Sequence, residues 1–327
     1  MDILNPRTLR ERADYTLARG RDPKKLVYTF AGISLAISLF VNLATLWLEH
    51  QISGTGGLGN MGMRAIFSTG QQGIPLISVL LSMCLELGYL GGMMRISRGQ
   101  YADHTDLKIG FRKFWALIRL NALEVLLYLA VGILSVQLAS LIFSMSPWAE
   151  PAAQLLAQLN IESIADLDEA TYIALLETMI PMYIISGILF LIGLIPVSFR
   201  LRMAKFCLLD DPNGRALAAI RASSKMMRRR FIPMLKIDLS LWMYYGATLL
   251  MMLLMYTDLF LAMLGIQIPL DATVFSLLIL AVTLAVQFAI QVTLRNRAET
   301  MYLLVYDELR EKPENSGPVV LGNIFDM

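Results

Sequence analysis

Residues 74–94 read IPLISVLLSMCLELGYLGGMM and contain a single charged side chain, that of Glu86. A helix needs roughly 20 predominantly apolar residues to cross a bilayer. A backbone that crosses lipid must also satisfy its own hydrogen bonds, which an α-helix does internally. This stretch therefore predicts a transmembrane helix.

Five further stretches of the chain are similarly long and apolar. In chain order, the six predicted spans are about 26–48, 74–94, 120–145, 181–199, 237–257 and 273–294. The sequence thus predicts an all-α fold, a six-transmembrane-helix bundle that occupies residues 26–297. Residues 1–25 are then an N-terminal segment and residues 298–327 a C-terminal tail.

The composition agrees with this interpretation. Hydrophobic residues make up 56% of the 327 residues and charged residues 17%, whereas an ordinary soluble domain has roughly 25% charged residues. These values exclude a conventional soluble enzyme, a disordered chain and a disulfide-stapled secreted domain. The two cysteines and two histidines show no metal-ligand spacing, and no phosphate-binding or hydrolase motif is present. We expect no enzyme activity, metal, cofactor or nucleic-acid partner.

The charges alternate between successive loops. Of the 28 Lys and Arg residues, only Arg64 lies in a loop that the six spans place on the outer side. Residues 146–180, on that same side, contain no Lys or Arg and six acidic residues. The positive-inside rule therefore predicts that both termini are cytoplasmic.

Two of the predicted cytoplasmic loops contain basic amphipathic helices. The first opens at Asp106, with Phe111 and Trp115 on its apolar side, and the second opens at Asp211. The basic residues of the two helices are Lys108, Arg112, Lys113, Arg221, Lys225, Arg228, Arg229 and Arg230. We expect them to bind anionic lipid headgroups. Alternatively, much of this charge simply sets the topology.

The two loops also suggest an internal repeat. Residues 74–145 and 181–255 each contain a helix, a basic amphipathic helix and a second helix. Two parallel repeats of this kind would be related by an axis along the membrane normal. The alternative is that any hairpin on the cytoplasmic side acquires basic residues.

The second half of the chain carries a set of family motifs. They comprise Ile195, Pro196, Phe199, Met203, Leu208, Leu209, Asp210, Pro212, Ala216, Ala219, Ile220, Ser223, Met226 and Met227. With Ser97-Arg98-Gly99, these residues resemble a family of bacterial polytopic membrane proteins, domain of unknown function 975. The sequence departs from the family at Arg228–Arg230, where a glycine is expected. The resemblance implies a six-helix bundle in the bacterial inner membrane, and no activity.

Glu86 is the strongest candidate for a functional residue, because ionisable groups inside a membrane are costly. It lies nine residues from Arg95, or about 13 Å along a helix. Gly88 and Gly92 beside it form a GxxxG motif, which lets another helix approach closely. Glu86 is either a site for a proton, a cation or a polar substrate, or a buried carboxyl group that hydrogen-bonds a neighbouring helix.

Three further residues complete the predicted intramembrane polar site with Glu86. Glu124 needs a partner on another helix. Gln287 and Gln291 belong to a polar stripe with Thr283 and Arg295, and this four-residue spacing places the stripe on one helix face. The stripe either joins its helix to neighbours by hydrogen bonds or lines a cavity with Glu86.

Two functions follow from these features. The first is a transport-like protein, a small permease, exporter or channel that works as a homo-oligomer around Glu86. The second is a non-catalytic membrane scaffold or regulator, which binds anionic lipid or a protein partner through its basic amphipathic helices.

Overall fold

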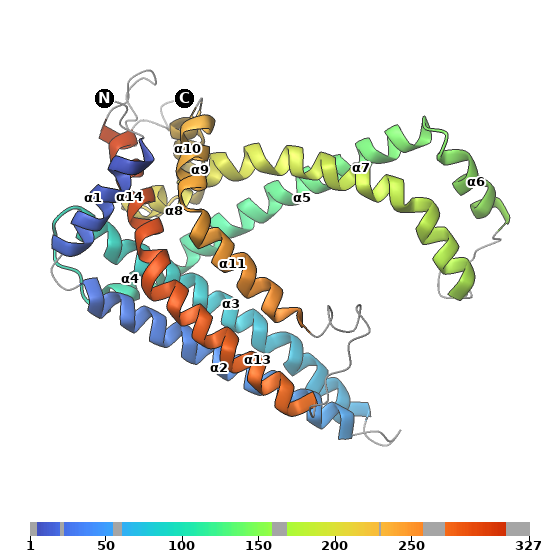
Figure 1. The fold of residues 1–327 in the computed structure, drawn as a ribbon, viewed down its shortest axis with the longest axis horizontal. Coiled ribbons are helices and arrows are strands. Elements are labelled where there is room, and N and C mark those ends of the chain that lie inside the picture. Colours follow the sequence, from blue (N-terminus) through green and yellow to red (C-terminus); the bar gives the residue numbers. More distant parts are fainter. Residues whose placement is uncertain are drawn as a thin grey trace.

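The computed structural model describes residues 5–19, 23–54, 61–158, 169–228, 230–257 and 272–311. Within these ranges the chain is helical almost throughout and forms no strand (Figure 1), which confirms the all-α prediction. In this described part of the chain, five helices are long and apolar enough to cross a membrane, or six if one bent pair counts as a single span. This is the architecture of a multi-pass membrane protein.

The helices extend beyond the apolar stretches that predict them. In chain order they are α1 (Pro6–Arg19), α2 (Pro23–Gly54), α3 (Met61–Ser97), η2 (His104–Leu107), α4 (Lys108–Arg112), α5 (Phe114–Ser144), α6 (Ala149–Gln158), α7 (Glu169–Leu201), α8 (Ala204–Asp210), α9 (Ala216–Met227), α10 (Phe231–Ser240), α11 (Trp242–Met255), α13 (Ala272–Ala289), the π-helical η4 (Ile290–Arg295) and α14 (Asn296–Glu311). The first basic loop is therefore not one amphipathic helix, because Lys113 separates α4 from α5.

The long helices form two arms that diverge from one end of the molecule (Figure 1). Helix α2 packs against both α3 and α13 in one arm, and α5 packs along α7 in the other. Both helices of the second arm expose large apolar side chains, including Leu126 and Ile192. Helices that are apolar on all sides suit a lipid environment.

The buried core lies at the end where the arms meet. It combines α1, α8, α9 and α14 with the adjoining ends of α3 and α5. Leu9, Leu87, Leu120, Leu208 and Met301 are fully buried there. The predicted C-terminal tail, residues 298–327, thus contributes most of helix α14 to the core.

Three glycines allow the first basic loop and α2 to approach α3. A Cβ on Gly88 would lie 2.2 Å from the Leu107 carbonyl oxygen, and one on Gly110 would lie 1.7 Å from the Cys84 carbonyl oxygen. A Cβ on Gly92 would lie 2.5 Å from the Leu26 side chain. No larger residue fits at these positions unless the backbone or Leu26 shifts.

The fifth predicted span is broken rather than continuous. Helices α10 and α11 are bent by 68° at Leu241. Arg202 binds both halves, through Asp238 of α10 at 2.5 Å and the Tyr245 hydroxyl of α11 at 2.6 Å. Its guanidinium group also donates to the Tyr302 hydroxyl at 2.7 Å. These contacts hold α10 and α11 at an angle to each other. No local pattern in the sequence predicts them.

Candidate functional site

Glu86 lies in a cluster of charged side chains where the two arms meet. Lys205 of α8 donates a hydrogen bond to its carboxylate at 2.9 Å, and Arg295 of η4 lies 3.6 Å away. Arg295 also pairs with Glu299 of α14 at 3.7 Å. The carboxylate expected inside the membrane is therefore held by two cations.

Arg295 is the most enclosed cation of this cluster. Its guanidinium carbon lies 5.1 Å from the centre of the Phe30 ring and 5.7 Å from that of Tyr89, distances typical of cation–π contacts. Arg295 ends the π-helical segment η4. Such segments inside α-helices occur frequently at functional sites.

Glu124 completes the cluster from α5. It lies close enough to Lys205 and Glu86 to interact electrostatically with both. Within the described ranges, its carboxylate accepts no hydrogen bond. We define the charged cluster as Glu86, Glu124, Lys205, Arg295 and Glu299; its three acids and two bases give a formal charge of −1.

Several polar atoms on α13 and η4 are buried without a hydrogen-bond partner in the described part of the chain. They are Thr283 Oγ1, Gln291 Oε1 and Arg295 Nε. A buried polar group that makes no hydrogen bond is destabilising, and such groups in native proteins call for an explanation. Gln291 and Arg295 are one turn apart on η4, so this part of the helix retains hydrogen-bonding capacity beside the cluster, whereas Thr283 lies further along α13.

The two glutamines of the predicted polar site lie against α2 instead of Glu86. Gln287 Nε2 donates to Ser38 Oγ at 3.3 Å, and Gln291 Nε2 donates to Ser34 Oγ at 3.0 Å. The glutamines therefore join α13 and η4 to α2. The last member of the stripe, Arg295, also contacts α2, at Phe30, and in addition joins the charged cluster.

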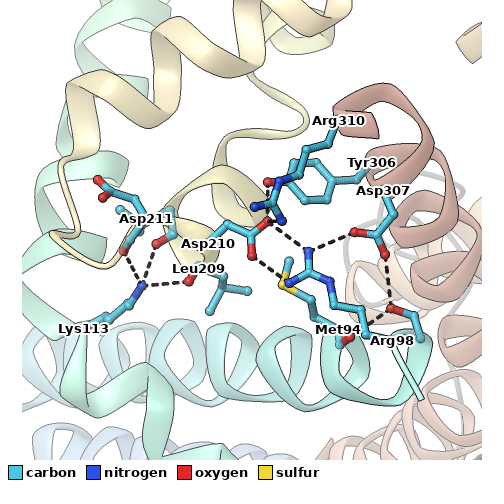
Figure 2. A network of polar contacts seen from close by, with 11 residues as sticks. Met94, Arg98, Lys113, Leu209, Asp210, Asp211, Tyr306, Asp307 and Arg310 are labelled. Atoms are coloured by element: carbon cyan, nitrogen blue, oxygen red, sulfur yellow. Dashed lines mark hydrogen bonds and ion pairs between the residues drawn. The ribbon is translucent and has the colours of Figure 1, made fainter. Parts of the chain in front are cut away.

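A second network ties the ends of α3, α8 and α14 together (Figure 2). Arg98 donates two hydrogen bonds to Asp210, at 2.8 and 2.9 Å, and one to Asp307 at 2.9 Å. Tyr306 and Arg310 donate to the same Asp210 carboxylate at 2.8 and 2.7 Å. The hydrogen bonds to Asp210 raise the pKa of the Arg98 guanidinium above its ordinary value, so it stays charged.

Lys113 takes part in this packing rather than facing solvent. Its ammonium group donates to the carbonyl oxygens of Leu208, Leu209 and Asp211, each at 2.8 Å (Figure 2). Partial burial lowers the pKa of Lys113, and the charges of Asp211 and Asp210 oppose this shift. The structure thus uses this residue to hold the α8–α9 turn against α5, a role that differs from the lipid contact expected for it.

The other basic residues of the two loops have varied environments. Lys108, Arg112, Arg221, Lys225 and Arg228 are exposed, and Arg230 is half-buried. Arg229 lies outside the described residues.

Sequence reasoning missed Lys205 and Glu299 as members of the cluster. Lys205 lies in a basic stretch that the charge pattern assigns to a cytoplasmic loop, and Glu299 lies in the expected tail. Neither residue interrupts one of the predicted spans, so hydropathy gives no signal for them. They reach the cluster because α8 and α14 fold back against α3.

Comparisons with known proteins identify no relative of this chain. No protein-family model matches the chain, and neither a curated protein nor a solved structure matches it.

Proposed function

We propose that this chain is a transport-like membrane protein, a small permease, exporter or channel, rather than an enzyme. The observation that supports this proposal is the charged cluster, which residues of α3, α5, α8 and the continuous helix η4–α14 assemble beside apolar helices. Ionisable groups in membrane-spanning segments are costly, and they commonly mark the pathways of ions or substrates.

The position of the cluster supports the same function. Glu86 and Lys205 each keep 31% of their side-chain surface exposed, so a solute could reach them. The cluster also lies where the arm of α5 and α7 meets the rest of the protein. A polar site between two groups of helices is the usual location for a transported solute.

For the membrane orientation, we propose six spans with both termini on the cytoplasmic side of a bacterial inner membrane. The bent pair α10 and α11 counts as one of these spans. The distribution of Lys and Arg supports the orientation, and so does the packing of α1 against α14. Two parallel repeats, a homo-oligomer and membership of the domain of unknown function 975 family stay predictions.

Solute flux into proteoliposomes tests the transport function. The panel contains potassium, chloride, glucose and tetraethylammonium, so that charge and size classes are separated. We expect at least one solute to enter faster than into protein-free liposomes, and Glu86→Gln and Lys205→Met to slow that entry at least tenfold. Glu150→Gln on α6 and Lys236→Met on α10 are matched controls, because both residues are exposed and lie outside the cluster. Flux that is equal in Glu86→Gln and wild type would refute the proposal.

A second candidate is the lipid-binding scaffold or regulator. It is favoured by exposed cations beside exposed apolar side chains, as at Arg112 with Trp115 and at Arg221 with Leu217. Trp115 is 70% exposed and Leu217 is 50% exposed. This combination suits the interface between headgroups and acyl chains.

Co-purifying lipid tests this second function. Mass spectrometry of the purified protein should detect less bound anionic phospholipid in the double variant Arg112→Glu/Arg221→Glu than in wild type. Arg7→Glu reverses an exposed charge on α1 and should retain the wild-type amount. An unchanged lipid content in the double variant would exclude these two residues as headgroup ligands.

A further inference from the structure

An apolar groove runs along α5 close to the charged cluster. It has a volume of about 620 Å³ and is lined mainly by apolar side chains of α5, with Phe190 of α7. Volumes of this size are typical of small-molecule sites. Val125, Leu129, Ile133 and Val136 form much of its wall.

One end of the groove reaches the charged cluster. Tyr128 lines the groove and interacts electrostatically with both Glu124 and Lys205. Glu124, Tyr128, Gly132 and Val136 are spaced by four residues, so they lie along one face of α5. From Glu124 to Val136 this face extends about 18 Å at the helical rise per residue.

The chemistry at that end favours a cation. The charged cluster has a formal charge of −1, with three acids and two bases. Glu86 already binds Lys205 and Arg295, and Glu299 pairs with Arg295. Glu124 is the acid of the cluster that forms neither a hydrogen bond nor an ion pair with a described residue, and it is the acid on the helix that forms the groove.

We propose that Glu124 and the groove bind a single-chain amphiphilic amine, with its ammonium group at Glu124 and its alkyl chain between α5 and Phe190. This inference names a substrate class for the proposed transport function and rests on it. Electrostatic attraction selects the charge of the head, and burial of apolar surface holds the chain. The length of the groove suits the chain of dodecylammonium.

Saturable binding of tritiated dodecylammonium to the full-length protein in lipid nanodiscs tests the proposal, with empty nanodiscs as the background. Unlabelled dodecylammonium should displace the probe. Dodecanoate has the same chain with the opposite charge, and butylammonium has the same head with a short chain. Each should compete at least tenfold more weakly than dodecylammonium.

Two variants address the two parts of the site. Glu124→Gln removes the charge and should weaken binding at least tenfold. Gly132→Leu should also weaken it at least tenfold by filling the groove, since a Cβ at Gly132 lies 3.8 Å from the Phe190 ring and leaves the backbone undisturbed. Glu150→Gln and Leu134→Phe are the matched controls; Leu134 is 62% exposed on the same helix and does not line the groove.

The outcomes separate this inference from the transport function. Wild-type affinity in Glu124→Gln, or equal competition by dodecanoate, would overturn it. Flux of another solute class without dodecylammonium binding would overturn the inference and leave transport standing. Dodecylammonium binding without flux of any solute would support the site and refute transport. Thermal unfolding of each variant shows whether its fold is intact.

Discussion

Gly88→Ala tests whether the first basic loop is held against α3 by close backbone contact. The added Cβ would lie 2.2 Å from the Leu107 carbonyl oxygen, whereas ordinary contacts begin at 3.4 Å. The loop must therefore withdraw by about 1.2 Å, the difference between these two distances. This movement would also disturb the Arg95–Asp106 ion pair, 2.6 Å long, that anchors η2 to α3.

Overpacking of a well-packed core costs about 1–3 kcal/mol. We expect the upper part of this range, because the clash involves backbone atoms that cannot rotate away. A loss of about 3 kcal/mol corresponds to a decrease in Tm on the order of 6 °C. Gly187→Ala on α7 is the control: its Cβ meets nothing within 4 Å, so helix propensity alone predicts a gain of up to about 1 kcal/mol.

A thiol-reactive fluorescent maleimide measures this difference in detergent. Both free cysteines, Cys84 and Cys207, are buried, so the dye reports unfolding. Circular dichroism provides a second readout that does not depend on Cys84, which lies near the substituted glycine. If Gly88→Ala unfolds within about one degree of Gly187→Ala, the close contact between the loop and α3 is refuted.

Three further substitutions test the polar contacts, with thermal unfolding as the measurement. Arg98→Ala should cost about 3 kcal/mol, because it leaves the nearly buried Asp210 with fewer cationic partners; Arg12→Ala, which removes an exposed ion pair with Glu308, should cost less than about 1 kcal/mol. Lys113→Met should cost about 2 kcal/mol by removing the donor to three carbonyl oxygens. Arg202→Gln should cost about 3 kcal/mol, since it removes the charge shared by both halves of the bent pair. A loss equal to that of Arg12→Ala in any of these three would show that its contacts contribute little.

The sequence predicts the helices because the free-energy cost of placing a polar backbone in lipid depends only on the segment itself. An apolar stretch such as residues 74–94 must form a helix whatever surrounds it. The close approach at Gly88 and Gly92 is also visible in sequence, as a GxxxG motif. Gly110 has no such motif, so its contact with the Cys84 carbonyl oxygen emerges only when α4 is folded against α3.

The partners of the charged residues could not be predicted in the same way. Glu86 binds Lys205, which is 119 residues away in the chain, and Arg98 binds Asp210 across 112 residues. An ion pair needs only opposite charge and proximity, and many Lys and Arg residues offer the charge. Proximity depends on α8 and α14 folding back onto α3, which neither hydropathy nor the positive-inside rule describes.

The polar stripe serves helix packing along its whole length and the charged cluster at its end. Residues four apart lie on one helix face, and Gln287, Gln291 and Arg295 contact Ser38, Ser34 and Phe30, which are also four apart on α2. The spacing in the sequence therefore predicts the packing of this helix against a neighbour. Arg295 also reaches Glu86 of α3, so both interpretations of the stripe apply at this residue. The contact with Glu86 could not be predicted from the spacing, because it depends on how α3 packs beside α2.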